Sequence, residues 1–188
     1  MTPKTKLAAA LFLAASLAAV PAVADAPARQ DHAHDFDFLI GKWKVHHWRL
    51  NGRLVGSHDW VEFGGTSQLW MTMDGKGTID DNYIGLPSGP YRAVGLRGYD
   101  PKTQTWAIWW LDGRNANGPL APPTIGNFDF KNGVGTFYGD DINNGKPVKV
   151  RYTWSKITKN SAHWEQAESP DHGKTWEVNW RMDFTRVQ

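Results

Sequence analysis

The chain of 188 residues contains no cysteine. This absence excludes disulfides, iron–sulfur clusters, thiol nucleophiles and cysteine-bound zinc. The sequence also lacks a nucleophile elbow, a P-loop, a dinucleotide-binding fingerprint and a His-Glu-x-x-His pair. Because these motifs are missing, no reaction can be named from the sequence, and any catalytic role has to rest on polar residues that the fold brings together.

No segment after the first residues is apolar enough to span a membrane. Lys4 and Lys6 precede an apolar run at 7–19 that is too short to cross a bilayer, and residues 22–24, Ala-Val-Ala, fit a cleavage site between small residues. We therefore predict a signal peptide at 1–24 and a periplasmic or secreted protein. Mass spectrometry of the exported protein is expected to find Asp25 as its first residue.

The predicted mature chain also lacks an excess of charge. The whole sequence has 21 Lys and Arg against 19 Asp and Glu, and loss of Lys4 and Lys6 with the signal peptide makes the two signs equal. A nucleic-acid partner normally requires a basic surface. We therefore expect no nucleic-acid partner.

Helical patterning is scarce as well, since no amphipathic stretch of about ten residues shows the 3.6-residue period. Turn-forming pairs that end in glycine recur instead, for example at 51–52, 112–113 and 144–145. Between such turns, runs like 148–154 and 176–184 alternate apolar and polar residues, which is the period of half-buried strands. The pattern predicts short strands joined by tight turns.

We predict an all-β fold, a single antiparallel meander of about ten strands. Closing such a meander into a barrel pairs both of its edge strands. The predicted barrel domain covers 36–188 and follows a flexible lead-in at 25–35 that is rich in Ala and His. The roughly 164 residues left after signal cleavage are enough for one hydrophobic core without disulfides.

Residues 168–176, ESPDHGKTW, match the Asp-box of sialidases and other β-propellers. A propeller needs at least about sixteen strands, more than this chain can supply. Asp171 can instead bond the backbone of a turn, Gly173 can take a positive φ, and Trp176 opens the next strand. We therefore interpret the motif as a hairpin turn and exclude sialidase activity.

The segment FDFLIGKW at 36–43 contains the G-x-W of Gly41 and Trp43. It resembles the first-strand signature of lipocalins and other calycin-like barrels, in which the tryptophan packs near the closed end. Together with 91–115, 135–141 and 164–186, it is similar to a family of bacterial domains of unknown function. This resemblance implies a calycin-like barrel and brings no established chemistry.

A neighbouring calycin group, the nitrobindin-like haem barrels, opens with a similar segment and binds haem through a histidine near the C-terminus. The last predicted strand here, 176–186, contains no histidine. The resemblance to that group therefore does not extend to haem. We expect no cofactor.

The seven histidines show no metal-binding spacing within the predicted core. His46 and His47 are adjacent, so on a strand their side chains face opposite ways and cannot share a metal. His47 shares a face with Trp43 and Val45 and is expected to point inward. We predict that the protein binds no metal.

Tryptophan is unusually frequent, with 11 residues, all after the predicted signal peptide. In the run 106–112, Trp110 shares one face with Asp112, while Trp109 lies on the other, so both faces are apolar. Such a strand suits a central place in the core or the wall of a pocket. Arg114 follows in the next turn, either at a pocket mouth or in an ion-paired turn. The predicted ligand site consists of Trp109, Trp110, Asp112, Arg114 and His47.

The last two predicted strands leave their orientation open. Their polar face is either an external ladder of ion pairs, each worth well under about 1 kcal/mol, or an inward group that grips a carboxylate or hydroxyl. In the second case His163 and Glu165 could act as an acid/base pair, although residues i and i+2 of a strand lie about 7 Å apart. The candidate catalytic residues are His163, Glu165, Asn179 and Arg181.

The function favoured by these observations is an exported barrel that binds a small hydrophobic or aromatic molecule in a Trp-lined cavity. One alternative is a cofactor-independent lyase, isomerase or hydrolase that acts on an aromatic or lipidic substrate there. The other is a domain that binds a protein or carbohydrate. Inward clustering of the four candidate catalytic residues would favour the enzyme, and an apolar cavity with one or two polar groups would favour the binding protein. The sequence does not indicate an oligomeric state.

Overall fold

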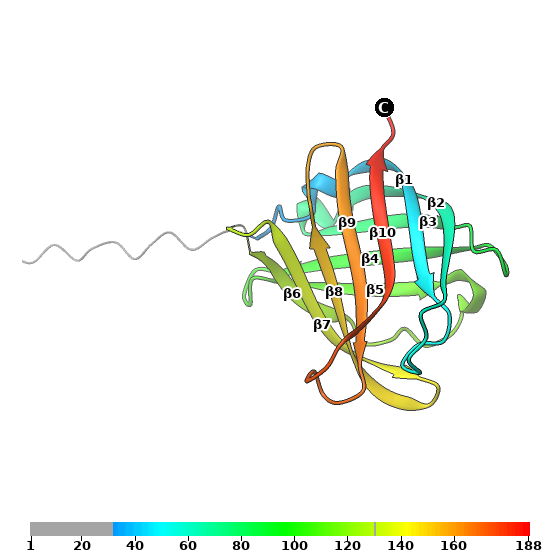
Figure 1. Cartoon of the computed structure of the whole chain (residues 1–188). Helices are drawn as coiled ribbons and strands as arrows, with labels where there is room; N and C mark the ends of the chain where they lie inside the picture. Colours follow the sequence, from blue (N-terminus) through cyan, green and yellow to red (C-terminus); the bar gives the residue numbers. More distant parts are fainter. Residues whose placement is uncertain (1–31, 130) are drawn as a thin grey trace, which may run out of the picture. The chain divides into compact units, whose positions relative to one another are not determined.

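Ten antiparallel strands form a closed barrel in the computed structural model, which describes residues 32–129 and 131–188 (Figure 1). Each strand pairs with its neighbours in sequence, and β1 pairs with β10 to close the sheet. The predicted all-β meander barrel of about ten strands is therefore confirmed. The strands are β1 (Gly41–Leu50), β2 (Trp60–Thr72), β3 (Gly77–Ile84), β4 (Tyr91–Asp100), β5 (Thr105–Asp112), β6 (Thr124–Asp129), β7 (Val134–Asn143), β8 (Lys146–Ser155), β9 (Ser161–Ser169) and β10 (Glu177–Arg186).

Helical structure in the described residues is limited to three 3-10 turns, η1 (Asp37–Leu39), η2 (Met73–Gly75) and η3 (Gly113–Asn115). Within those residues, no helix has the length and apolar character needed to cross a bilayer. The predicted signal peptide at 1–24 and most of the predicted lead-in, 25–31, lie outside the described residues.

Residues 32–35, which the sequence pattern places in the flexible lead-in, pack against the barrel. The backbone oxygen of His32 accepts a hydrogen bond of 2.7 Å from the indole of Trp106. Asp35 is buried and accepts a hydrogen bond from the backbone N–H of Phe128. These four residues are therefore part of the folded domain.

An aromatic plug fills the end of the barrel at which η1 lies, called the upper end below. Phe36 is fully buried in this plug, in edge-to-face contact with Trp106 and Phe128 at 5.1 and 5.3 Å between ring centroids. Trp43, the tryptophan of the G-x-W segment, is buried beside it and donates a hydrogen bond of 2.7 Å to the backbone oxygen of Leu39. The plug therefore closes the upper end with side chains.

The loops β1–β2, β3–β4, β5–β6, β7–β8 and β9–β10 lie at the opposite, lower end, because successive connections of a meander alternate between ends (Figure 1). The Asp-box motif forms the β9–β10 loop. Asp171 accepts hydrogen bonds from the hydroxyls of Ser169 and Thr175 and from the backbone N–H of Thr175. These bonds hold the pKa of Asp171 well below its usual range, with the backbone N–H of Thr175 as the largest cause. The motif is thus a hairpin turn, as its residues predict.

Candidate functional site

A cavity of about 80 Å³ lies inside the barrel. Its wall consists of side chains from η1, from β1 to β5 and from β8 to β10. Aromatic and aliphatic groups make up most of this wall, but His47, Asp80, Asn82, Arg97 and Gln166 also line it. The cavity therefore has more polar groups than the one or two expected for a simple apolar pocket.

Four indole rings form part of the cavity wall, those of Trp110, Trp154, Trp164 and Trp180. Trp180 is in edge-to-face contact with Trp110 and Trp164, with ring centroids 6.2 and 5.8 Å apart. Trp164 and Trp180 lie on the paired strands β9 and β10, and the period of two turns their rings to the same side of the sheet. Such ring edges and faces suit a flat apolar ligand.

His47 lines the same cavity and is 1% exposed. Its ring stacks on Phe63 at 4.8 Å, and its Nδ1 accepts a hydrogen bond of 3.2 Å from the indole of Trp180. Gly65 makes room for this ring, because a Cβ at position 65 would lie 2.6 Å from Nε2 of His47. The prediction that His47 points inward is confirmed.

The imidazole of His47 is neutral in this setting. Burial, followed by the charges of His46 and Arg49, lowers its pKa to about 4. Because Nδ1 accepts the bond from Trp180, the ring proton is assigned to Nε2. Nε2 is buried and has no hydrogen-bond partner among the described residues. His47 thus presents an unused N–H donor inside the barrel.

Asp80 and Arg97 form a buried ion pair on β3 and β4 that also lines the cavity. Asp80 accepts further hydrogen bonds from the side chain of Asn82 and from the backbone N–H of Gly95 at 2.8 Å. The absence of a side chain at Gly95 is required, since a Cβ there would lie 2.4 Å from the carboxylate. With three donors on its carboxylate, Asp80 suits a structural role better than that of a general base.

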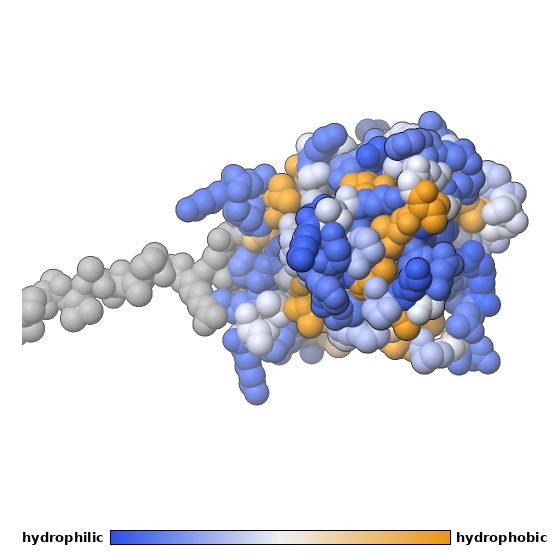
Figure 2. Space-filling model, turned by 60° about the horizontal axis from the view of Figure 1, so that its bottom comes forward, coloured by the Kyte–Doolittle hydropathy of each residue, from blue (hydrophilic) through white to orange (hydrophobic). Residues whose placement is uncertain are grey.

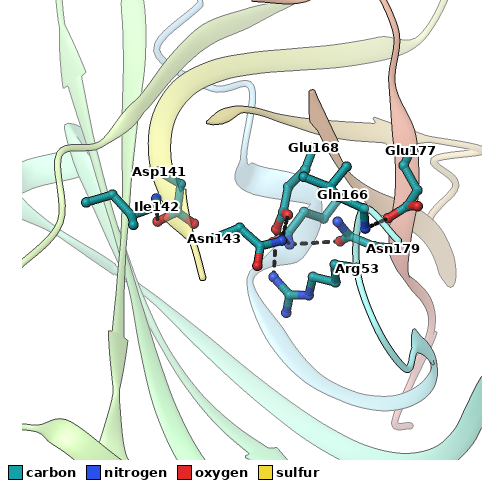
Figure 3. Close-up of polar contacts among 9 residues, drawn as sticks. Arg53, Asp141, Ile142, Asn143, Gln166, Glu168, Glu177 and Asn179 are labelled. Carbon is teal, nitrogen blue, oxygen red and sulfur yellow. Dashed lines mark hydrogen bonds and ion pairs between the residues drawn. The ribbon is translucent and has the colours of Figure 1, made fainter. Parts of the chain in front are cut away.

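A second buried carboxylate, Glu168, holds the lower end together (Figure 3). It accepts hydrogen bonds of 2.7 Å from Arg53 in the β1–β2 loop and from Asn143 on β7. Gln166 donates to Glu168 at 3.4 Å and to the side-chain oxygen of Asn179 at 2.9 Å. These contacts tie a loop, a hairpin and two strands to one anion.

The structure separates the residues of the predicted ligand site. Trp110 and His47 lie in the cavity wall. Trp109 immediately precedes Trp110 on β5. Because adjacent strand residues face opposite sides, its ring faces the outside of the barrel, where it is half-buried. Asp112 and Arg114 form a two-bond ion pair at the lower rim, with Arg114 stacked 3.9 Å from the ring centroid of Tyr91. Their roles in binding stay predictions.

The candidate catalytic residues do not come together inside. His163 and Glu165 alternate with the cavity residues of β9 and therefore face outward. On that outer face His163 pairs with Asp183 at 2.5 Å, and Arg181 pairs with Glu165 at 3.2 Å. The inward acid/base arrangement is thus wrong for these three candidates, His163, Glu165 and Arg181, and the external ladder of ion pairs is found instead.

Asn179 is the exception among the four candidates. The pairing of β10 with β9 shifts by one residue between Val178 and Trp180, and this irregularity turns Asn179 into the interior, where it is fully buried. There it accepts the hydrogen bond from Gln166. An alternating pattern cannot foresee such a bulge, because it changes the facing of a residue without changing the sequence period.

Several residues of the cavity escape prediction from sequence. The run GTIDDNYI, 77–84, has polar and apolar residues on both faces, so nothing in it marks Asp80 and Asn82 as inward. Trp164 and Trp180 carry a weak signal, because each lies on the apolar face of an alternating strand. Arg97 has no local signal at all, since its partner comes from the neighbouring strand.

No group of three or more His, Cys, Asp or Glu side chains in 32–129 and 131–188 is arranged to hold a metal ion. Two histidines on the outer faces of strands pair with carboxylates, His46 with Glu62 at 3.1 Å and His163 with Asp183 at 2.5 Å. That the protein takes up neither metal nor haem stays a prediction.

No protein-family model and no curated protein matches the chain. Among solved structures, the S-type phycobiliprotein lyase CpeS from Guillardia theta is similar, with a TM-score of 0.56 and 10% identity, over 85% of this chain and 94% of that one. A redesigned β-barrel covers 84% of this chain and 96% of its own length, with a TM-score of 0.44 and 10% identity. The likeness to the lyase supports the calycin-like barrel and assigns no family.

Proposed function

We propose that the barrel binds a small apolar or aromatic molecule that carries a hydrogen-bond acceptor. The observation that carries this proposal is the buried, unpartnered Nε2–H of His47 beside the indoles of the cavity wall. A buried donor without a partner costs about 1–3 kcal/mol. An acceptor atom on a bound ligand would remove that cost, while Trp110, Trp164 and Trp180 contact its apolar part.

The size of the cavity limits the ligand. One water molecule needs roughly 10–15 Å³ of such space, so about 80 Å³ corresponds to roughly five to eight waters. This suits a molecule with about one ring. A larger ligand would require the side chains of the wall to move.

Binding is favoured over catalysis because the interior offers no free acid/base pair among the described residues. Asp80 already accepts from Asn82, Gly95 and Arg97, and Glu168 accepts from Arg53 and Asn143. The fold also supports binding, since small closed barrels can hold one small ligand among the side chains of their interior. As an untested expectation, the binding takes place in the periplasm or outside the cell.

The test is a titration of the intrinsic fluorescence with one-ring aromatic ketones and phenols, in a matched pair of variants. Trp110 and Trp109 are neighbours on β5, but only Trp110 lines the cavity. We expect Trp110→Phe to weaken binding by roughly tenfold. Trp109→Phe should leave the affinity within about twofold of wild type.

A third variant, His47→Phe, keeps a ring on Phe63 but removes the donor. It should lower the affinity for ligands that carry a hydrogen-bond acceptor by about tenfold, which corresponds to the loss of one hydrogen bond. If no compound quenches the wild type, or if the Trp109 and Trp110 variants lose affinity equally, binding in this cavity is wrong.

A further inference from the structure

An open cleft of about 440 Å³ lies at the lower end of the barrel. Three arginines line it, Arg49 at the end of β1, Arg53 in the β1–β2 loop and Arg114 in η3. None of the described residues that line the cleft is acidic. Figure 2, which brings the bottom forward, shows a mostly hydrophilic face with apolar residues between.

The charges of these arginines are not all matched. Arg53 pairs with Glu168 at 2.7 Å, and Arg114 pairs with Asp112 at 2.5 Å. Arg49 interacts with the side chain of Tyr91 through a hydrogen bond, and its charge acts on Asp112, but no carboxylate in the part of the chain that the structure describes forms an ion pair with it. Burial, and next the nearby Arg53, lowers the pKa of Arg49. Among the arginines that line the cleft, Arg49 is therefore the one that pairs directly with no carboxylate of the described residues, since Asp112 pairs with Arg114.

Arg49 lies between the cleft, which it lines, and Trp180 of the cavity wall. Its guanidinium lies 4.8 Å from the ring centroid of Trp180, whose indole belongs to the cavity wall. His47 precedes it by two residues on the same strand, so their side chains share a face about 7 Å apart. The guanidinium of Arg49 therefore lies at the rim, and the Nε2–H of His47 lies deeper in the barrel on the same face of β1.

We propose that the ligand is an organic carboxylate, with its apolar group in the cavity against Trp180 and its carboxylate on the guanidinium of Arg49. This inference rests on the proposed binding function and adds the ligand's charge to it. A guanidinium fits a carboxylate with two parallel N–H···O bonds. Arg53 and Arg114 keep their own carboxylates, so Arg49 is the group that selects for the anion.

The test compares an aromatic carboxylate with its neutral amide, 3-phenylpropanoate with 3-phenylpropanamide, by isothermal titration calorimetry near about pH 7. The two compounds have nearly the same shape and differ in charge. Wild-type protein should bind the carboxylate at least about tenfold more tightly than the amide. Raising the salt concentration from about 50 to about 500 mM should weaken binding of the carboxylate but not binding of the amide.

Three variants locate the effect. In Arg49→Gln, the affinities for the carboxylate and the amide should differ by no more than about twofold. Arg49→Lys keeps the charge and should still bind the carboxylate about a few fold more tightly than the amide. Arg92→Gln removes an exposed arginine, the partner of Asp81 on the outer face, and should leave the preference unchanged. Thermal unfolding of each variant checks that it is folded.

The outcomes separate the two proposals. Equal binding of carboxylate and amide to the wild type overturns the anion preference and leaves the cavity as a site for neutral ligands. An undiminished preference in Arg49→Gln overturns the role of Arg49. If neither compound binds and the fluorescence titrations also fail, both the anion preference and the binding function are wrong.

Discussion

Among single residues, His47 departs furthest from the behaviour of its free side chain. Burial is the main reason that its pKa falls from 6.5 to about 4. Between these two values the unfolded chain binds a proton at His47 that the folded chain does not. The stability that the neutral imidazole contributes is therefore complete above about pH 6.5 and is lost as the pH falls toward 4.

Replacing His47 with glutamine should flatten this pH dependence. Glutamine keeps an acceptor for the indole of Trp180 but takes up no proton. Between about pH 7 and about pH 4.5, the wild type should lose about 2.5 kcal/mol more free energy of unfolding than His47→Gln. Urea unfolding at both pH values measures the difference, and equal losses in the two proteins would show that the fold admits a charged His47.

The inward position of His47 can be predicted because it alternates with Trp43 and Val45, both of them buried. Arg49 continues the same face, yet the sequence gives no reason to expect it in a site. An arginine at the end of a strand usually extends into solvent. Only the closure of the barrel, in which β1 pairs with β10, brings Arg49 over Trp180, and a contact this distant in sequence leaves no local pattern.

At the scale of strands, the alternation of apolar and polar residues predicts the inward face correctly where that face is uniformly apolar. The run 148–154 falls within β8, and Trp180, Met182 and Phe184 of β10 face the interior. Val178 does not, because it precedes the irregularity and pairs with the outward Ala167. The opposite happens in β3, where Asp80 is buried while Ile79 and Tyr83 are 39% and 41% exposed. A polar inward face becomes stable through partners on the next strand, and a single strand's sequence does not contain those partners.

The η1 segment provides the element-scale prediction. Phe36 is fully buried among the rings of Trp106, Phe128 and Phe137. Phe36→Ala should therefore lower the free energy of unfolding by about 3–5 kcal/mol, since the plug cannot close the space left by the ring.

Ile40→Ala is the control for Phe36→Ala, because Ile40 adjoins the same segment but is 37% exposed. It should cost less than about 1 kcal/mol. Urea denaturation of both variants makes the comparison. Similar losses in the two would mean that the plug contributes no more than surface packing does.

For the whole molecule, the closed meander leaves two ends of different chemistry. Rings fill the upper end, whereas polar side chains around Glu168 join the loops of the lower end. Both features follow from one topology, since all the loops of one end come from alternate connections. The fold class can be read from turns and alternation, but the polarity of each end depends on which residues closure brings together.

The two ends should therefore respond differently when the contacts of Glu168 are changed. Glu168→Gln keeps the size of the side chain but releases Arg53, whose side chain is 23% exposed and can move into water. Amides of the loop at 51–59 should exchange faster, while those of the plug around Trp106 stay protected. Hydrogen exchange measures both regions in one experiment.

Arg53→Ala should be the more harmful of the two changes at the lower end. It leaves the charge of Glu168 buried, with only Asn143 and Gln166 to donate to it, whereas Glu168→Gln removes that charge. Breaking a buried pair from one side costs up to about 3–5 kcal/mol, so Arg53→Ala should lower the free energy of unfolding by more than Glu168→Gln does. Urea unfolding of the two variants ranks them. The reverse order, or faster exchange throughout β5 and β8 in Glu168→Gln, would mean that the lower-end contacts and the plug form one cooperative core instead of two separable ends.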